Sequence, residues 1–200
     1  IGDQFLNAGP GFGGSCFKKD ILNLVYLSGH FGLPEVAKYW NQVVIMNTWQ
    51  QDRIYKIVLE KLFGTANGKN IAILGFSFKA NTNDTRESPA IRISSDLLEE
   101  GAKLTIYDPK VSYEKIADDL EKFSYNNQGI WKMAKSIPEA LRNVDAVLIL
   151  TAWDEFYGLD WNYLASLMRS PAWVFDTRSV VNRNEIENTG LNLWKLGEGR

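Results

Sequence analysis

The first third of the chain shows the apolar spacing of two helices. Apolar residues recur at helical intervals from Cys16 to about Tyr26 and again from Pro34 to about Phe63. The second segment predicts a rod of roughly 30 residues, about 45 Å long at about 1.5 Å per residue. Polar residues around Asn47 break its apolar stripe, and the rest of the stripe must be buried against another surface.

From residue 70 onward, short apolar runs alternate with helical patterns. Ser88, Pro89 and Gly101 suit the cap, first turn and end of one helix, and Ser136–Glu139 suits a capping box. This alternation predicts a parallel, doubly wound sheet, whose ligands bind at the carboxyl ends of the strands. The expected strands are 71–75, 104–107, 131–134, 146–151, 173–176 and 191–196. The predicted fold is α/β, with a helical arm over 1–66 and an α/β domain over 67–200.

Residues 9–20, which read GPGFGGSCFKKD, form the strongest chemical signal. Glycines let a backbone approach a ligand closely, and the positive end of the following helix favours a thiolate. Cys16 is therefore a candidate nucleophile, and Asp20, one helical turn further on, could act as a base or position water. The alternative is a buried structural cysteine that follows an ordinary flexible loop.

Composition excludes several classes of protein. Of 200 residues 45% are hydrophobic, and a net charge of −2 offers no basic field for nucleic acid or an anionic membrane. One cysteine allows no internal disulfide, and with one histidine it makes a zinc cluster untenable. His30 suits the exposed end of a helix. No apolar run approaches the ~20 residues that span a bilayer, and no signal peptide is visible, so a cytoplasmic protein is expected.

The glycine–cysteine segment closely resembles the catalytic-cysteine motif of the UDP-glucose/GDP-mannose dehydrogenase family. FKKD at 17–20 is similar to the UDP-glucose branch of that family. Similar landmarks follow in the right order along essentially the whole chain: GFSFK at 75–79, DTRESP at 84–89, YDPK at 107–110, TAWDEF at 151–156 and FDTR at 175–178. The resemblance implies a Rossmann-like UDP-binding domain after the helical arm.

The resemblance also implies a role for each matching residue. Cys16 is the nucleophile, Asp20 handles water or protons, and Arg86 reaches the pyrophosphate of NAD. The implied contacts with the UDP-sugar are Phe5, Leu6, Asn7, Phe12, Gly13, Gly14, Phe17, Phe78, Lys79 and Arg178. Asn7 departs from the family, where a lysine is expected. Without the resemblance, Lys79 and Arg178 would be read as solvated surface cations.

The segment after the first strand is no evidence for NAD binding by itself. Gly75 lacks the second and third glycines of a dinucleotide fingerprint. Asp108 ends the second strand, where it is either a ribose-binding acid or a turn residue before Pro109.

The implied reaction is the NAD-dependent oxidation of UDP-glucose to UDP-glucuronate through a thiohemiacetal and a thioester on Cys16. Because the chain opens at Ile1 without an initiator methionine, we expect a piece of a longer polypeptide. The resemblance implies that an N-terminal domain binds most of the NAD, so this chain alone should not catalyse the reaction. The resemblance also implies a homodimer through the long helix. Two alternatives remain: a nucleotide-binding module only, or a dehydrogenase for GDP-mannose or UDP-N-acetylmannosamine.

Overall fold

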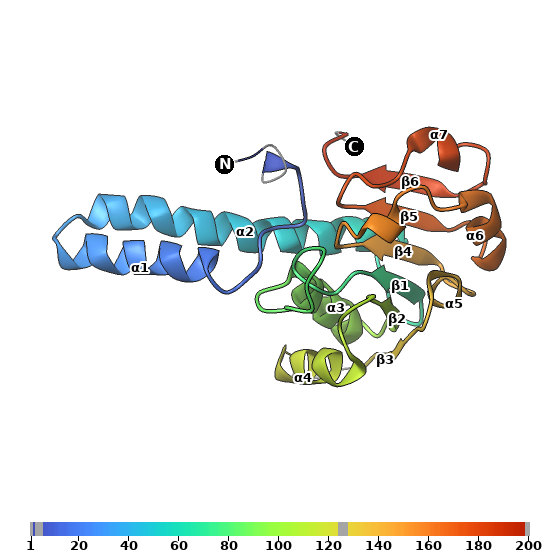
Figure 1. The fold of residues 1–200 in the computed structure, drawn as a ribbon, viewed down its shortest axis with the longest axis horizontal. Coiled ribbons are helices and arrows are strands. Elements are labelled where there is room, and N and C mark those ends of the chain that lie inside the picture. Colours follow the sequence, from blue (N-terminus) through green and yellow to red (C-terminus); the bar gives the residue numbers. More distant parts are fainter. Residues whose placement is uncertain (1, 3–5, 124–127, 199–200) are drawn as a thin grey trace.

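The computed structural model describes residues 2, 6–123 and 128–198. A helical hairpin projects from an α/β domain (Figure 1). The hairpin consists of α1 (Phe17–His30) and α2 (Pro34–Lys61), which pack along each other. The predicted long helix is thus confirmed.

The end of α1 differs from the sequence-based prediction, which stopped the helix near Tyr26. The helix continues through Gly29 to His30. Gly32, the residue after the C-cap Phe31, has a φ of +73° and lies in the left-handed region. The Leu33 N–H donates to the Ser28 carbonyl at 2.8 Å and the Gly32 N–H donates to the Gly29 carbonyl at 3.1 Å, which is a Schellman motif.

The α/β domain contains one parallel sheet of six strands in the order β3-β2-β1-β4-β5-β6. The predicted doubly wound fold is therefore confirmed. The order reverses between β1 and β4, and such a switch point opens a crevice at the carboxyl ends of the strands. The strands are β1 (Asn70–Leu74), β2 (Lys103–Tyr107), β3 (Ile130–Met133), β4 (Ala146–Ile149), β5 (Trp173–Asp176) and β6 (Asn192–Lys195).

Helices cover both faces of the sheet. One face carries α3 (Pro89–Glu99), α4 (Tyr113–Phe123) and the end of α2. The other carries α5 (Ile137–Ala140), the 3₁₀ turn η2 (Asp154–Phe156), α6 (Trp161–Leu167) and α7 (Arg183–Ile186). Ser88 and Ser136 cap α3 and α5 as predicted, accepting hydrogen bonds at 3.3 Å from the N–H groups of Ala90 and Glu139.

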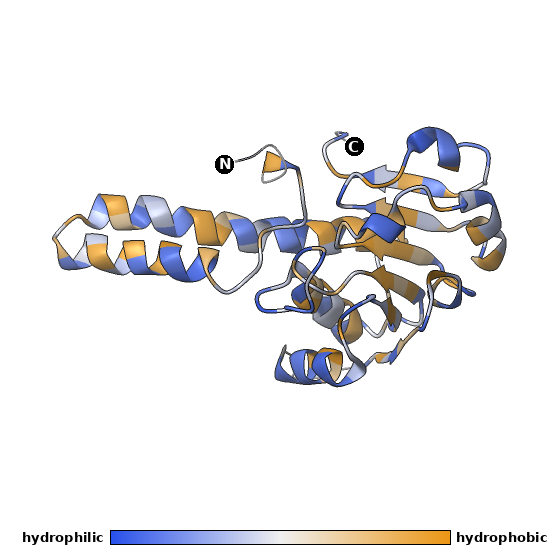
Figure 2. Ribbon diagram, in the orientation of Figure 1, coloured by the Kyte–Doolittle hydropathy of each residue, from blue (hydrophilic) through white to orange (hydrophobic). Residues whose placement is uncertain are grey.

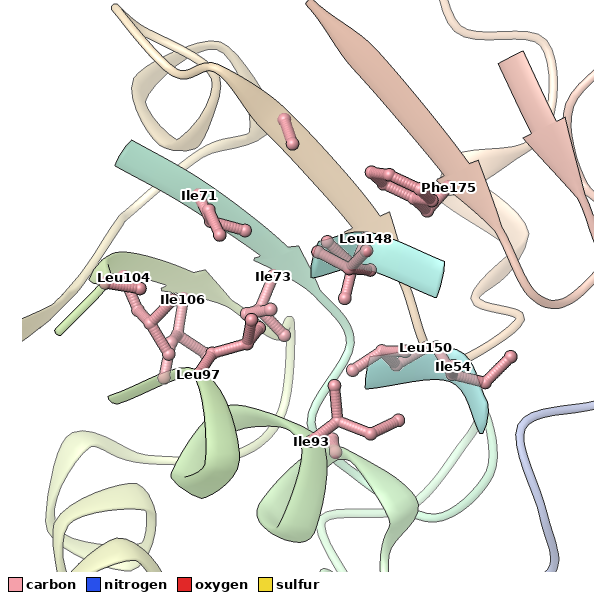
Figure 3. Close-up of a cluster of buried hydrophobic side chains, with 14 of the residues drawn as sticks. Ile54, Ile71, Ile73, Ile93, Leu97, Leu104, Ile106, Leu148, Leu150 and Phe175 are labelled. Atoms are coloured by element: carbon pink, nitrogen blue, oxygen red, sulfur yellow. The ribbon is translucent and has the colours of Figure 1, made fainter. Parts of the chain in front are cut away.

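Side chains of each strand alternate between two hydrophobic cores, as the pleat requires. The core under α3 includes Ile73, Leu97 and Leu148, and it also takes up Ile54 from α2 (Figure 3). Ile54 and Val58 are fully buried there. The C-terminal half of α2 is therefore part of the domain core, and it fixes the helical arm relative to the sheet.

Among the described residues, none of the helices has the length and apolarity needed to cross a membrane. The same residues contain no cluster of three or more acidic, histidine or cysteine side chains placed to hold a metal ion.

Candidate active site

The glycine-rich loop, residues 9–14, lies between α2 and the segment that joins β1 to α3 (Figure 1). On the α2 side, the Asn47 side chain makes two hydrogen bonds to the backbone of Phe12. The Gln50 Nε2 donates to the Gly9 carbonyl at 3.0 Å. The loop is therefore held by side-chain amides of a helix whose other end is anchored in the core.

On its other side the loop contacts the segment after β1. The Gly14 N–H donates to the Arg86 carbonyl at 2.8 Å. A Cβ on Gly13 would lie 2.5 Å from the Glu87 carbonyl oxygen, and one on Gly14 would lie 2.9 Å from the Phe78 ring. Gly14 also has a φ of +85°, which disfavours any other residue. The two glycines thus allow Phe78 to pack directly on the loop backbone.

Cys16 caps the N-terminus of α1 and is exposed. The Ser15 Oγ lies 3.7 Å from its Sγ. The Asp20 N–H donates to the Cys16 carbonyl at 2.8 Å, so the exposed Asp20 stands one helical turn away, as predicted. Lys18 forms an ion pair with Glu87 at 2.7 Å, which ties the first turn of α1 to the β1–α3 segment.

Arg178 is a partly buried cation whose guanidinium faces the loop. Its Nε donates to the Leu150 carbonyl at 2.8 Å, and its Nη1 lies 2.7 Å from where a Cβ on Gly9 would be. No carboxylate among the described residues pairs with it. Burial lowers the pKa of Arg178 to about 10, so the guanidinium stays charged at neutral pH. A desolvated cation without a counter-charge favours a bound anion.

Arg86 is exposed and makes a bidentate contact with Asp84, with Nε–Oδ1 at 2.9 Å and Nη2–Oδ2 at 2.7 Å. Its pKa is raised, first by the hydrogen bonds to Asp84 and least by the charge of Cys16. Asp84 therefore holds the Arg86 guanidinium in place.

Of the residues predicted to contact the UDP-sugar, Phe12 and Phe17 lie together, whereas Leu6, Asn7 and Lys79 are exposed. Lys79 is exposed, with its Nζ 5.5 Å from the centre of the Phe78 ring. Leu6 is 76% exposed, and Asn7 is also exposed. Phe5 lies outside the described residues. Phe12 packs edge-on against Phe17, with ring centroids 4.6 Å apart.

Asp108 serves the fold and is buried. Its Oδ2 accepts hydrogen bonds from the N–H groups of Phe76 and Ser77 and from the Trp153 indole, at 2.7 to 3.1 Å. Its Oδ1 accepts from the N–H groups of Lys110 and Val111 at 2.9 and 3.0 Å. All these partners are internal, so Asp108 positions the segment that leads to Phe78.

The sequence patterns assigned no contact role to Asn47, Gln50 or Glu87. The polar break in the apolar stripe around Asn47 was the available signal for the first two. Two surface hollows of about 310 and 520 Å³ lie elsewhere: one between α2 and α3, the other at the amino ends of β1, β2 and β3.

Comparison with known proteins gives consistent results. Residues 72–183 match the UDP-binding domain of the UDP-glucose/GDP-mannose dehydrogenase family, and residues 1–49 match the family's central domain. The chain is 46% identical to the UDP-glucose 6-dehydrogenase of Drosophila melanogaster, over 99% of this chain and 43% of that protein. It is 42% identical to UDP-glucose 6-dehydrogenase 4 of Arabidopsis thaliana, over 99% of this chain and 44% of that protein.

A solved UDP-glucose dehydrogenase from the hyperthermophilic archaeon Pyrobaculum islandicum is similar in structure, with a TM-score of 0.71 and 29% identity. The similarity covers 98% of this chain and 40% of that one. The chain thus spans less than half the length of these relatives.

Proposed function

The chain belongs to the UDP-glucose/GDP-mannose dehydrogenase family, and we propose that it supplies the UDP-sugar site and the nucleophile of an NAD-dependent UDP-glucose 6-dehydrogenase. The observation that carries the proposal is the arrangement around the glycine-rich loop. Cys16 follows one end of the loop, while the unpaired Arg178 guanidinium faces the other end at Gly9. An extended ligand with a diphosphate at one end and a reactive carbon at the other suits that arrangement.

We propose the following roles for the residues. The Arg178 guanidinium binds the diphosphate, and Phe78 and Lys79 line the nucleotide side together with Leu6 and Asn7. Phe12, Gly13, Gly14 and Phe17 lie along the sugar. Phe5 belongs to the same proposed set. The domain boundary near residues 66 and 67 is likewise proposed, because the two family matches end and begin on either side of it.

The chemistry proposed for Cys16 is covalent. A first hydride transfer from the C6 alcohol of the sugar, with loss of the hydroxyl proton, would give an aldehyde. The Cys16 thiolate would add to its carbonyl carbon, forming a C–S bond, and the oxygen would take up a proton to give a thiohemiacetal. A second hydride transfer would oxidise the thiohemiacetal to a thioester. Water then attacks the acyl carbon and the C–S bond breaks, which releases the sugar carboxylate and regenerates the free Cys16 thiolate. Asp20, one turn away, is proposed to handle the proton of that water.

Residues of the α/β domain do not fit a dinucleotide of their own. The acid that would bind a ribose, Asp108, is occupied by five internal hydrogen bonds. NAD would accept the hydrides when it is bound. We propose that its binding site lies mainly in the part of the relatives that this chain does not span, with Arg86 as the contact from this chain. By itself the chain is expected to form no NADH.

Protection of Cys16 tests this function. Because Cys16 is the single cysteine, alkylation by iodoacetamide reports on one site. We expect saturating UDP-glucose to slow the alkylation by about tenfold, because a sugar held against the thiol excludes the reagent. UDP lacks the sugar and should protect less. Equal protection by GDP-mannose would move the substrate to that branch, and no protection by any nucleotide sugar would refute the proposal.

We also propose that the chain forms a homodimer through the helical arm. Apolar residues recur along both helices of the hairpin (Figure 2). Several large side chains with apolar surface are exposed on the two helices and the turn between them, namely Tyr26, Phe31, Tyr39, Ile45, Met46 and Trp49. A contiguous exposed apolar surface is typical of a protein–protein interface. Sedimentation velocity at increasing concentration should show a dimer, and Ile45→Glu should weaken it. A strict monomer at every concentration would contradict the proposal.

A further inference from the structure

We propose that Asn47 is a positioning residue of the active site, which shapes the glycine-rich loop from the middle of α2. The inference rests on the proposed function, because it concerns the loop that carries Cys16 and lines the sugar. It assigns a purpose to the polar break in the apolar stripe of the long helix.

Asn47 satisfies both backbone groups of a single loop residue. Its Oδ1 accepts from the Phe12 N–H at 2.8 Å, and its Nδ2 donates to the Phe12 carbonyl at 3.1 Å. A carboxamide carries a donor and an acceptor side by side, so asparagine matches this pair where aspartate or serine does not. Gln50, one turn further on, binds the Gly9 carbonyl. Two side-chain amides of α2 therefore bind the backbone of the glycine-rich loop, one at Phe12 and one at Gly9.

The loop in turn is shaped to lie on the helix. Gly11 has a φ of +124°, and a Cβ there would lie 2.8 Å from the Asn47 Oδ1 and 3.3 Å from the Gln51 Cγ. Glycine is thus required on steric and conformational grounds. The backbone of the loop is therefore shaped to lie against the Asn47 side chain. An asparagine whose side chain only contacted water would not require a glycine at position 11.

The contact reaches Cys16 along the chain. The Phe12 ring packs on Phe17, the residue that follows Cys16. Two residues after Phe12, the Gly14 N–H is bound to the Arg86 carbonyl. Asn47 is therefore the middle of three backbone anchors before the thiol, between the Gln50 contact at Gly9 and the Arg86 contact at Gly14. Loss of this anchor frees residues 10–13, and a ligand must then order them at the expense of affinity.

The test uses two variants and a control on the same helix. Asn47→Asp keeps the acceptor and places a second carboxylate oxygen against the Phe12 carbonyl. Asn47→Ser cannot reach both backbone groups. Gln42→Glu is the matched control, because Gln42 is exposed on α2 and its side chain makes no hydrogen bond to the described residues. A nitroxide attached to Cys16 reports the local mobility without a ligand, and calorimetry on unlabelled protein gives the affinity for UDP-glucose.

We expect a clearly more mobile nitroxide in both Asn47 variants, and an affinity for UDP-glucose that is lower by about tenfold, while Gln42→Glu matches the wild type. Unchanged nitroxide mobility in a folded Asn47 variant overturns the inference. Greater mobility with unchanged affinity overturns it as well. Failure of the proposed function looks different, because the wild-type chain itself would then not bind UDP-glucose while the nitroxide comparison would still hold.

Discussion

Arg178→Ala is expected to weaken the binding of UDP-glucose about a hundredfold, equivalent to about 2.7 kcal/mol, which is typical of a lost charge-assisted contact. The Arg178 side chain is partly buried and charged at neutral pH, and no described carboxylate pairs with its guanidinium. A diphosphate would supply the missing counter-charge. The dissociation constant from calorimetry measures the effect.

Two further variants sharpen this prediction. Arg178→Lys keeps the charge, but an ammonium group cannot both donate to the Leu150 carbonyl and bind a phosphate in a bidentate way. We therefore expect the affinity for UDP-glucose to fall about tenfold. Arg183→Ala is the control. It removes an exposed arginine that also follows β5 in the chain but pairs with Glu198, and it should leave the affinity for UDP-glucose unchanged. An affinity of Arg178→Ala within about threefold of the wild type would exclude Arg178 from the site.

Asp108→Ala is expected to lower the free energy of unfolding by about 4 kcal/mol, because buried N–H donors lose their acceptor at about 1–3 kcal/mol each. The carboxylate accepts five hydrogen bonds and is only 3% exposed. Urea unfolding followed by circular dichroism measures the loss. UDP-glucose affinity should also fall, because Asp108 holds Phe76 and Ser77 just ahead of Phe78.

The controls for Asp108 separate burial from charge. Asp108→Asn keeps the shape but turns an amide nitrogen toward N–H donors, so a loss of about 2 kcal/mol is expected. Asp118→Ala removes an exposed carboxylate paired with Lys122 and should leave the unfolding midpoint unchanged. If Asp108→Ala were as stable as Asp118→Ala, the carboxylate would not organise the β1–α3 segment.

The features that could be predicted are those that depend on residues close together in the sequence. Strand positions followed from runs such as Ile71–Leu74, and the start of α3 followed from Ser88 and Pro89. By contrast, α4 was not predicted, because among its residues 113–122 the only fully buried apolar residues are Ile116 and Leu120, in a strongly charged segment. Helices α6 and α7 were missed as well, and both are short.

The site was harder to predict, because its contacts join distant segments. The Asn47–Phe12 pair spans 35 residues, and nothing local in either segment specifies the other. The sequence placed Arg178 at a strand end but gave no information on its burial or on its missing acidic partner. For Asp108 it left two roles open, and only the fold supplies the five donors that decide between them.

The most direct test of the account is a calorimetric titration of the wild-type chain with UDP-glucose, UDP, GDP and NAD⁺. The account predicts that UDP-glucose and UDP bind, because the proposed diphosphate site at Arg178 and the glycine-rich loop lie within these residues. GDP is expected to bind much more weakly because residues 72–183 match a UDP-binding domain, and NAD⁺ because this chain is proposed to supply only one contact to it. Tighter binding of GDP or NAD⁺ than of UDP-glucose, or no binding of UDP-glucose, would contradict it.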